Sequence, residues 1–296
     1  MLFVEVILPV FLIILCGFVL EKRAKLDFRT LTDASLYLFS PALVFAALMK
    51  RPIEFALAAD LLLFMLLYSG GLLLLALVLG RALKMAPETG RALALTTVMM
   101  NVGNFGLPLA FFAFGEAGLE YSVLTFVIFN IPLSTLAILL AQRTGVRLLP
   151  ALGNMLRIPI FHAMTAALLL QIIEVELADF LFRPIELLGQ AAIPLMLVLL
   201  GMQLARTRLV TEPGFLLLAS VIRLGLAPLL AWWLTGWIGM DGLARKVAIL
   251  QTSTPSAVLP LLYSLRFGTR PDLVSGAIFV STLLSAATLS ILLWLL

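Results

Sequence analysis

The sequence contains one cysteine and one histidine among 296 residues. A lone cysteine excludes an intrachain disulfide, and the scarcity of both residue types excludes a zinc-type cluster. Cys16 lies in an apolar stretch, so we expect it to be a small buried apolar residue. His162 is a candidate proton carrier, although ordinary hydrogen bonding near a helix end is the simpler interpretation.

Charged residues are also scarce. They make up 12% of the chain, whereas about 25% is usual for soluble domains. Hydrophobic residues make up 62%, which is more than one soluble core of this size can hide. The composition therefore predicts an integral membrane protein that contacts membrane lipid. The formal charge of +4 does not indicate nucleic acid, because basic residues in membrane proteins mostly report loop orientation.

Motifs of several enzyme classes are missing. The sequence has no Walker loop, no HExxH, no GxSxG and no CxxC. A primary pump needs a nucleotide site, and an intramembrane hydrolase needs a nucleophile beside a base. We therefore predict a protein that is not an enzyme and has no cofactor beyond a coupling ion, Na⁺ or H⁺. Short connections leave no room for a soluble domain, which argues against a membrane sensor or scaffold.

A membrane-spanning helix needs roughly 20 predominantly apolar residues. The chain has ten such candidate segments, which predict an all-α integral membrane protein. They cover residues 2–20, 31–49, 58–80, 91–114, 119–141, 158–174, 182–204, 214–237, 245–266 and 273–295. The first segment lacks a basic start and a small-residue cleavage site, so we expect a retained helix and not a signal peptide.

Lysines and arginines are distributed unevenly between alternate loops. Fourteen fall after the odd-numbered predicted helices and five fall on the opposite side. Because basic loops stay in the cytoplasm, this bias predicts a multi-pass inner-membrane protein with both termini outside.

The two halves of the chain correspond. Five helices in 1–141 and five in 158–296, joined by a short cytoplasmic linker at 142–157, predict two inverted five-helix repeats. The fourth helix of each half, 91–114 and 245–266, begins with an arginine and contains a polar, Gly- or Pro-rich interruption followed by Leu-Pro-Leu. Matching interrupted helices in two inverted halves indicate the binding site of a secondary transporter.

The interruption in the first half is the stretch NVGNFGLP, residues 101–108. Pro108 cannot donate a backbone hydrogen bond, while Gly103 and Gly106 weaken the helix and permit a positive φ. Unwound backbone in hydrocarbon must face protein or a water-filled cavity. We therefore expect this stretch to cross its partner at Thr254-Pro255-Ser256. The simpler alternative is a pair of kinked helices that pack through small residues.

Half-helices that meet near the middle of the membrane direct their N-terminal ends at a shared centre. Those ends carry partial positive charge and free N–H groups, which suit a carboxylate. Amides and hydroxyls can add hydrogen bonds. The candidates are Asn101, Asn104, Thr252, Ser253, Thr254 and Ser256.

Arg223 lies near the middle of segment 214–237. An arginine at the bilayer centre costs at least about 2.5–3.5 kcal/mol, so it must face the protein interior. Two interpretations stay open. The guanidinium is either a counter-charge for an anion, or it is tied to backbone carbonyls or extends to an interface.

Several stretches together resemble the auxin efflux carrier family, in particular its bacterial members. They are SPALVF (40–45), NVGNFGLPL (101–109), AAIPLMLVLLGMQLA (191–205), IRLGLAPLL (222–230), STPSAVLPLLYSLRFG (253–268) and FVSTLLS (279–285). The resemblance covers nearly the whole chain, and it rests on the order and spacing of the stretches.

The resemblance implies ten helices with crossed, discontinuous helices 4 and 9, as in bile-acid sodium symporters and sodium/proton antiporters. It implies that Asn101 contacts a substrate carboxylate, that Pro108 is the first crossing proline, and that the second crossing runs from Pro255 to Pro260. It also implies a homodimer, with predicted helices 1, 2, 6 and 7 as a scaffold. The long cytoplasmic loop of the plant proteins is missing here.

We therefore predict a secondary active transporter of small organic anions that works by elevator-like alternating access. The substrates would be carboxylates such as malate, malonate or auxin-like acids. A Na⁺ ion could bind near Asn104, Ser253 and Thr254. The alternative is a cation/proton antiporter or a gated channel without an organic substrate.

Overall fold

The computed structural model describes residues 3–24, 26–51, 54–141, 159–207 and 212–296, without the side chains of 131–141 and 267. The predicted linker at 142–157 lies outside the described residues. Throughout the described part the regular structure is helical, and the only β pairing is one isolated bridge. The all-α prediction is therefore confirmed.

Several of the helices contain or adjoin π-helical turns, labelled η. In chain order the elements are η1 (Phe3–Ile7), α1 (Leu8–Ala24), α2 (Phe28–Ala34), η2 (Ser35–Phe39), α3 (Ser40–Lys50), α4 (Phe55–Ala82), α5 (Pro87–Val98), η3 (Val102–Gly106), α6 (Leu107–Ala141), α8 (Pro159–Ile172), α9 (Asp179–Arg206), α10 (Pro213–Val221), η4 (Ile222–Leu226), α11 (Ala227–Ile238), α12 (Gly242–Thr252), α13 (Leu259–Phe267) and α14 (Pro271–Leu295).

Seven helical stretches in the described part are long and apolar enough to cross a membrane. They cover Phe3–Ala24, Phe28–Lys50, Phe55–Ala82, Val102–Asn130, Asp179–Arg206, Pro213–Ile238 and Pro271–Leu295. The difference from ten has a physical cause. Segments 91–114 and 245–266 are each divided by a non-helical break, and segment 158–174 forms the 14-residue helix α8.

The predicted boundary between helices 4 and 5 also has a structural counterpart. Gly115 interrupts α6 with φ 68° and ψ −156°, which is outside the helical region. Only glycine adopts such a conformation readily. The chain therefore turns at Gly115, close to the predicted end of segment 91–114.

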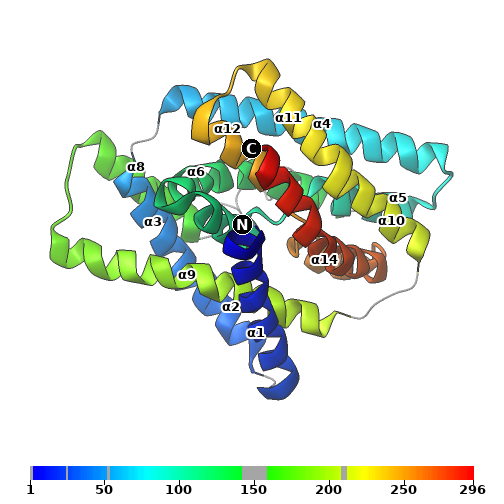
Figure 1. Cartoon of the computed structure of the whole chain (residues 1–296), viewed down its shortest axis with the longest axis horizontal. Coiled ribbons are helices and arrows are strands. Elements are labelled where there is room, and N and C mark those ends of the chain that lie inside the picture. The colour runs from blue at the N-terminus through cyan, green and yellow to red at the C-terminus, as the bar shows by residue number, and fades with distance from the viewer. Residues whose placement is uncertain (1–2, 25, 52–53, 142–158, 208–211) are drawn as a thin grey trace.

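The helices form two bundles, each of which takes elements from both halves of the sequence (Figure 1). The first bundle contains α1, α2, α3, α8 and α9, and its most extensive contacts join α1 to α9 and α3 to α8 and α9. The second bundle contains α4, α5, α6 and α10–α14. Contacts between the bundles come mainly from α3, α9 and η1 against α6 and η3.

Glycines hold the first bundle together by allowing backbones to touch. A Cβ added to Gly17 of α1 would overlap the carbonyl of Val198, and one added to Gly201 of α9 would overlap the carbonyl of Ile14. This reciprocal contact brings α1 and α9 closer than any larger residue would permit. Small residues at helix interfaces are the usual solution in membranes, where lipid tails are as apolar as leucine.

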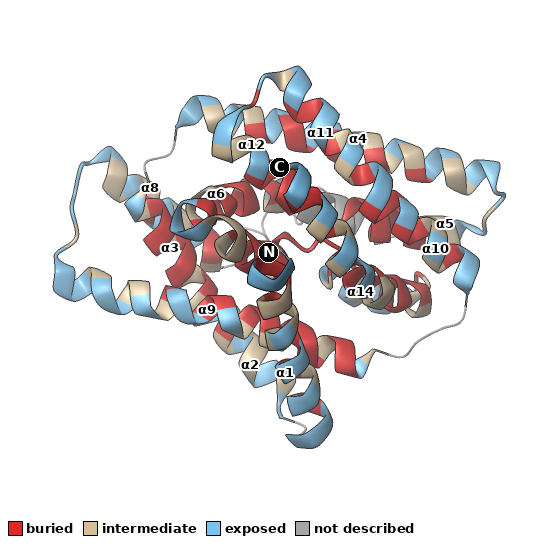
Figure 2. Cartoon of the chain, viewed as in Figure 1, coloured by how far each residue is buried: buried red, intermediate tan, exposed pale blue. Residues whose placement is uncertain are grey.

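Many large apolar side chains are exposed on the outer surface of the described part. Buried residues concentrate where the helices face one another (Figure 2). Cys16 corrects one expectation, because its side chain is exposed on α1 and not buried. An apolar side chain in a membrane gains little by facing protein instead of lipid. An apolar sequence context therefore does not predict burial here.

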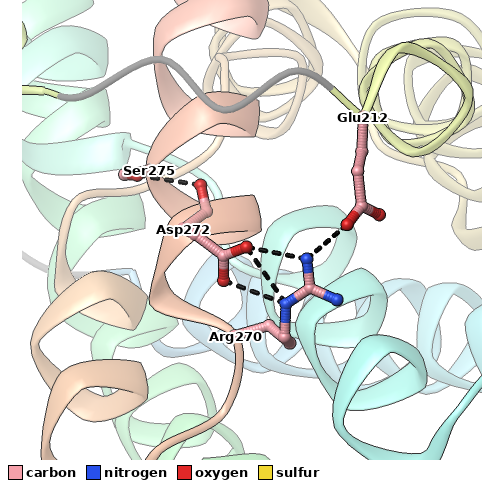
Figure 3. Close-up of polar contacts among 4 residues, drawn as sticks. All are labelled: Glu212, Arg270, Asp272 and Ser275. Carbon is pink, nitrogen blue, oxygen red and sulfur yellow. Dashed lines mark hydrogen bonds and ion pairs between the residues drawn. The ribbon is translucent and has the colours of Figure 1, made fainter.

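Clusters of ion pairs lie at the ends of several helices. Arg270 joins the beginning of α10 to the beginning of α14, because its guanidinium contacts Glu212 Oε1 at 2.5 Å and Asp272 Oδ2 at 2.7 Å (Figure 3). These two carboxylates raise the pKa of Arg270 above its usual range. A second cluster links the bundles, since Lys50 of α3 contacts Glu186 of α9 at 2.6 Å and Glu116 of α6 at 3.8 Å.

We expect Gly201→Ala to destabilise the protein, because its methyl group would force α1 and α9 apart. Overpacking of this kind costs about 1–3 kcal/mol. The measurement is the apparent melting temperature in detergent. Gly70→Ala in α4 is the matched control, since a Cβ there meets no atom within 4 Å. Equal melting temperatures for Gly201→Ala and wild type would contradict the close packing.

Candidate functional site

The two interrupted helices meet at their breaks. Residues 99–101, between α5 and η3, pair with residues 255–257, between α12 and α13, through an antiparallel bridge at Met100 and Ser256. The amide of Asn101 donates to the carbonyl of Pro255 at 2.9 Å, and the amide of Ala257 donates to the carbonyl of Met99 at 2.9 Å. We call residues 99–101 and 253–258 the paired breaks.

The prolines explain where the helices stop and begin again. Pro255 has no amide hydrogen and lies within one break, where its carbonyl is used by Asn101. Pro260 is the second residue of α13, a position where the missing amide hydrogen leaves no helix hydrogen bond unmade. Pro108 lies at the junction of η3 and α6, inside the continuous helical stretch Val102–Asn130, where it cannot donate the regular helix hydrogen bond. All three are buried. The breaks satisfy each other's backbone groups, as buried peptide groups require.

The role predicted for Gly103 and Gly106 is corrected by the structure. Neither residue has a positive φ, and both lie in the π-helical turn η3. A Cβ on Gly106 would overlap Oε1 of Gln251, and a Cβ on Gly103 would lie 3.1 Å from Cε2 of Phe126. Close packing against neighbouring helices therefore explains glycine at these positions.

Arg223, in η4, lies fully buried beside the paired breaks. Its Nη1 donates to the carbonyl of Thr97 at 2.7 Å, and its Nη2 donates to the hydroxyl of Tyr68 at 2.6 Å and to the carbonyl of Thr252. The Tyr68 hydroxyl in turn donates to the Thr252 carbonyl at 2.7 Å. Of the two interpretations left open by the sequence, the contacts are those of an arginine tied to backbone carbonyls.

These carbonyls belong to the C-terminal ends of α5 and α12. Each helix end carries about half an elementary charge, negative at the C-terminus and positive at the N-terminus. The guanidinium therefore offsets two C-terminal ends. The N-terminal ends of η3 and α13 adjoin the same breaks and have no side-chain cap. The local balance is about one positive charge, which favours an anion.

The Asn101 side chain supplies a donor at this positive end. The residue is 5% exposed, and its Nδ2 has no hydrogen-bond partner in the described part of the chain. A buried amide without an acceptor costs about 1–3 kcal/mol. The arrangement suits a ligand that brings an acceptor oxygen.

Sequence reasoning missed Gln251, which is completely buried in the last turn of α12. Its Nε2 donates to the hydroxyl of Ser122 in α6, and its Oε1 has no partner among the described residues. Ser122 and Tyr68 were missed as well. A polar residue within the apolar run VAILQ was the available signal for Gln251.

The remaining predicted residues differ in their contacts. Ser256 joins the breaks to their surroundings, because its hydroxyl donates to the Thr96 carbonyl at 2.6 Å and its amide donates to Ser281 Oγ at 3.2 Å. The hydroxyls of Ser253 and Thr254, directly after α12, donate to the carbonyls of Ile249 and Gln251 near the end of that helix at 2.6 and 2.7 Å. Asn104 is half-buried in η3.

His162 does not join this site. Its side chain is exposed in the first turn of α8, in the first bundle.

A cavity of about 470 Å³ reaches the paired breaks at Ser253. Its other walls come from η4, α11 and α14 and are mostly apolar. Asn101 and Arg223 are not among the residues that line this cavity.

We expect Arg223→Met to lower the melting temperature strongly, because two carbonyls and the Tyr68 hydroxyl lose their charged donor. Hydrogen bonds to charged groups contribute about 1.5–3 kcal/mol each. Arg223→Lys should recover only part of the loss, since an ammonium lacks the planar fork. Thermal unfolding in detergent measures both variants.

A chemical rescue tests the same contacts. Free guanidinium at millimolar concentration should raise the melting temperature of Arg223→Ala and leave wild type unchanged. Arg183→Met is the control for Arg223→Met, because Arg183 is largely exposed and pairs only with Asp179 in the described residues. Wild-type stability in Arg223→Met would refute the capping role.

Comparisons with known proteins agree with this architecture. A family model described as "Membrane transport protein" matches residues 2–153 and 146–294. An uncharacterized transporter of Methanocaldococcus jannaschii is 25% identical, with 99% of this chain and 98% of that protein covered. An uncharacterized transporter of Methanothermobacter thermautotrophicus is 27% identical, with 96% and 95% covered.

A third relative comes from Rhizobium meliloti and is named "Putative malonate transporter". It is 29% identical over 279 residues, which cover 88% of this chain and 84% of that protein. The family match extends over nearly the whole sequence. The chain therefore belongs to the membrane transport protein family of the auxin efflux carrier type, and it is a membrane transporter and not an enzyme.

Proposed function

We propose that this membrane transporter carries small organic anions by secondary transport, with the paired breaks as its substrate site. The observation that carries the proposal is the charge balance at the breaks. Arg223 offsets the C-terminal ends of α5 and α12, so the uncapped N-terminal ends of η3 and α13 remain. An anion adds the missing negative charge.

A carboxylate fits the hydrogen-bonding groups as well as the charge. Asn101 offers an unpartnered amide donor directly before the N-terminus of η3. The printed name of the Rhizobium meliloti relative supports a small dicarboxylate such as malonate. In the proposed site, the Asn101 side chain binds one carboxylate oxygen and the η3 amides that follow Val102 bind the other, since the Val102 amide donates to the Met100 carbonyl.

Alternating access would come from sliding of the second bundle against the first. We propose ten spans in two inverted repeats, 1–141 and 158–296, in which the divided segments 91–114 and 245–266 cross at the paired breaks. The site residues belong to the second bundle, while α1 and α9 are locked together by Gly17 and Gly201. This division favours an elevator-like movement with the first bundle as scaffold.

A cation/proton antiporter is less well supported. Such a carrier needs a buried carboxylate to exchange its ions. Glu21 is the only buried acidic residue in the described part, and it pairs with Arg206 at 2.8 Å, away from the breaks. A gated channel is also less well supported, because buried backbone pairing closes the site.

The possible Na⁺ site near Asn104, Ser253 and Thr254 is a separate question. The carbonyl ends that would attract a cation are already held by Arg223. We therefore propose that the carrier does not require Na⁺, and that it is driven by the proton gradient or by the substrate gradient alone.

Asn101→Ala should abolish the thermal stabilisation of the detergent-solubilised protein by malonate or malate, because the carboxylate loses its side-chain donor. In proteoliposomes, wild type should show counterflow of labelled malonate, and the variant should lose it. Transport should persist when choline replaces Na⁺. Malonate transport is also measured under an imposed pH gradient, which tests whether the proton gradient drives it.

Asn130→Ala is the matched control. That amide donates to the Phe126 carbonyl of its own helix at 2.7 Å and takes no part in the breaks. Normal malonate binding by Asn101→Ala would show that the site assignment is wrong. Flux of labelled malonate without counterflow would indicate a channel.

We propose that both termini face outward across the inner membrane, as the bias of basic loops indicates. Cys16 is the only cysteine, so Cys16→Ser provides a background for single-cysteine labelling. An impermeant maleimide should label Ala24→Cys, at the exposed end of α1, only in opened cells and Glu54→Cys in intact cells. The reverse pattern would overturn the orientation. We also propose a homodimer, which light scattering in detergent tests.

A further inference from the structure

A basic cleft lies between the end of α4 and the beginning of α5, remote from the paired breaks. It has a volume of about 560 Å³. Its charged lining consists of Arg81, Lys84 and Arg91, and no acidic residue is among its lining residues. Nothing in the proposed transport cycle uses this cleft.

The cations of the cleft are only partly neutralised by carboxylates. No Asp or Glu of the described chain forms an ion pair with Arg81 or Lys84. Arg91 reaches Glu88 only at 3.4 Å, and its buried Nε has no hydrogen-bond acceptor in the described structure. The cleft therefore carries a local excess of positive charge.

The α4 helix does not need these cations for its own C-terminus. The amides of Leu83, Lys84 and Met85 already donate to the carbonyls of Leu79, Arg81 and Gly80 at 2.9–3.0 Å. Arg81 contacts the Leu77 carbonyl at 3.5 Å, the limit for a hydrogen bond. The side chains of Arg81 and Lys84 are available for an external ligand.

The beginning of α5 also borders the cleft. Ala86 precedes the helix and makes no side-chain cap, and Pro87 is at its first turn. Glu88 in the same turn contacts Arg91 and offsets part of the positive charge at this end of the 12-residue helix.

Two glycines leave the cleft open. A Cβ on Gly80 would lie 3.7 Å from the Cα of Gly90, so α4 and α5 are in ordinary contact there. A Cβ on Gly90 would meet no atom within 4 Å. Gly90 therefore borders free space, and a larger side chain at this position would fill the cleft without removing charge.

The position and the walls of the cleft identify its ligand. The spanning helix Phe55–Ala82 ends at the cleft, which places Arg81 and Lys84 at the level of lipid headgroups. Ala76, Leu77 and Met85 form an apolar wall beside them. Basic pockets next to apolar helix surfaces fit the phosphate and the acyl chains of an anionic phospholipid.

We propose that this cleft binds the headgroup phosphate of an anionic phospholipid, with Arg81, Lys84 and Arg91 as the phosphate donors. The acyl chains follow Ala76 and Leu77 along α4. The lipid would hold the N-terminal end of α5, the helix whose C-terminal carbonyl is bound by Arg223. A single short helix thus connects the lipid cleft to the paired breaks.

Native mass spectrometry and thermal unfolding test this proposal on the full-length protein in detergent. Phosphatidylglycerol should bind and raise the melting temperature, while phosphatidylcholine should do neither. Inorganic phosphate at the same concentration should also have no effect, because it lacks the chains that contact the apolar wall. Equal effects of the two lipids, or an equal effect of inorganic phosphate, would overturn the proposal.

Variants locate the effect. Arg81→Gln with Lys84→Gln should weaken phosphatidylglycerol binding by roughly 30-fold, since each basic residue near a headgroup contributes about a factor of five. Gly90→Leu should weaken binding while all charges remain. The control is Lys22→Gln with Arg23→Gln, two exposed basic residues at the end of α1. A loss of binding in the control equal to that in the cleft variants would refute the site.

Discussion

A helix that is broken inside a membrane leaves backbone groups that neither lipid nor water can satisfy. This protein contains two such breaks, and each provides the partners of the other through the bridge between Met100 and Ser256. Arg223 completes the arrangement by donating to both C-terminal ends. The mutual pairing and the buried guanidinium depend on one another, because neither break has enough partners alone. The rest of the second bundle is organised around them.

The same interaction underlies the proposed preference of the site for an anion. An arginine used on carbonyl ends would ordinarily be unavailable to a ligand. Here its effect is indirect, since offsetting the C-terminal ends leaves the positive N-terminal ends of η3 and α13 unopposed. The first bundle is held together by a different interaction, close packing at glycines. Gly17 and Gly201 let α1 and α9 touch backbone to backbone, which suits a rigid support.

Much of the site could be predicted from residue types that are out of place in apolar runs. Proline in such runs indicated the breaks, and arginine indicated the buried charge, while the substrate contact predicted for Asn101 stays a prediction. The errors have physical causes. Gly106 is required by its contact with Gln251 and not by its φ, and Cys16 faces outward because apolar residues need no protein cover in lipid. The role of Gln251 depends on Ser122, which is 129 residues away in the sequence.

The sequence by itself determined that the chain is helical, embedded in a membrane and interrupted at two corresponding places, because hydrophobicity and proline act locally along the chain. It also placed Arg223 within a span, where the cost of burial demands partners. Only the tertiary structure decided which partners those are. The carbonyls of Thr97 and Thr252 lie on two helices far apart in the sequence. They meet at one guanidinium only when the second bundle has formed, because this contact depends on packing between segments far apart in the sequence.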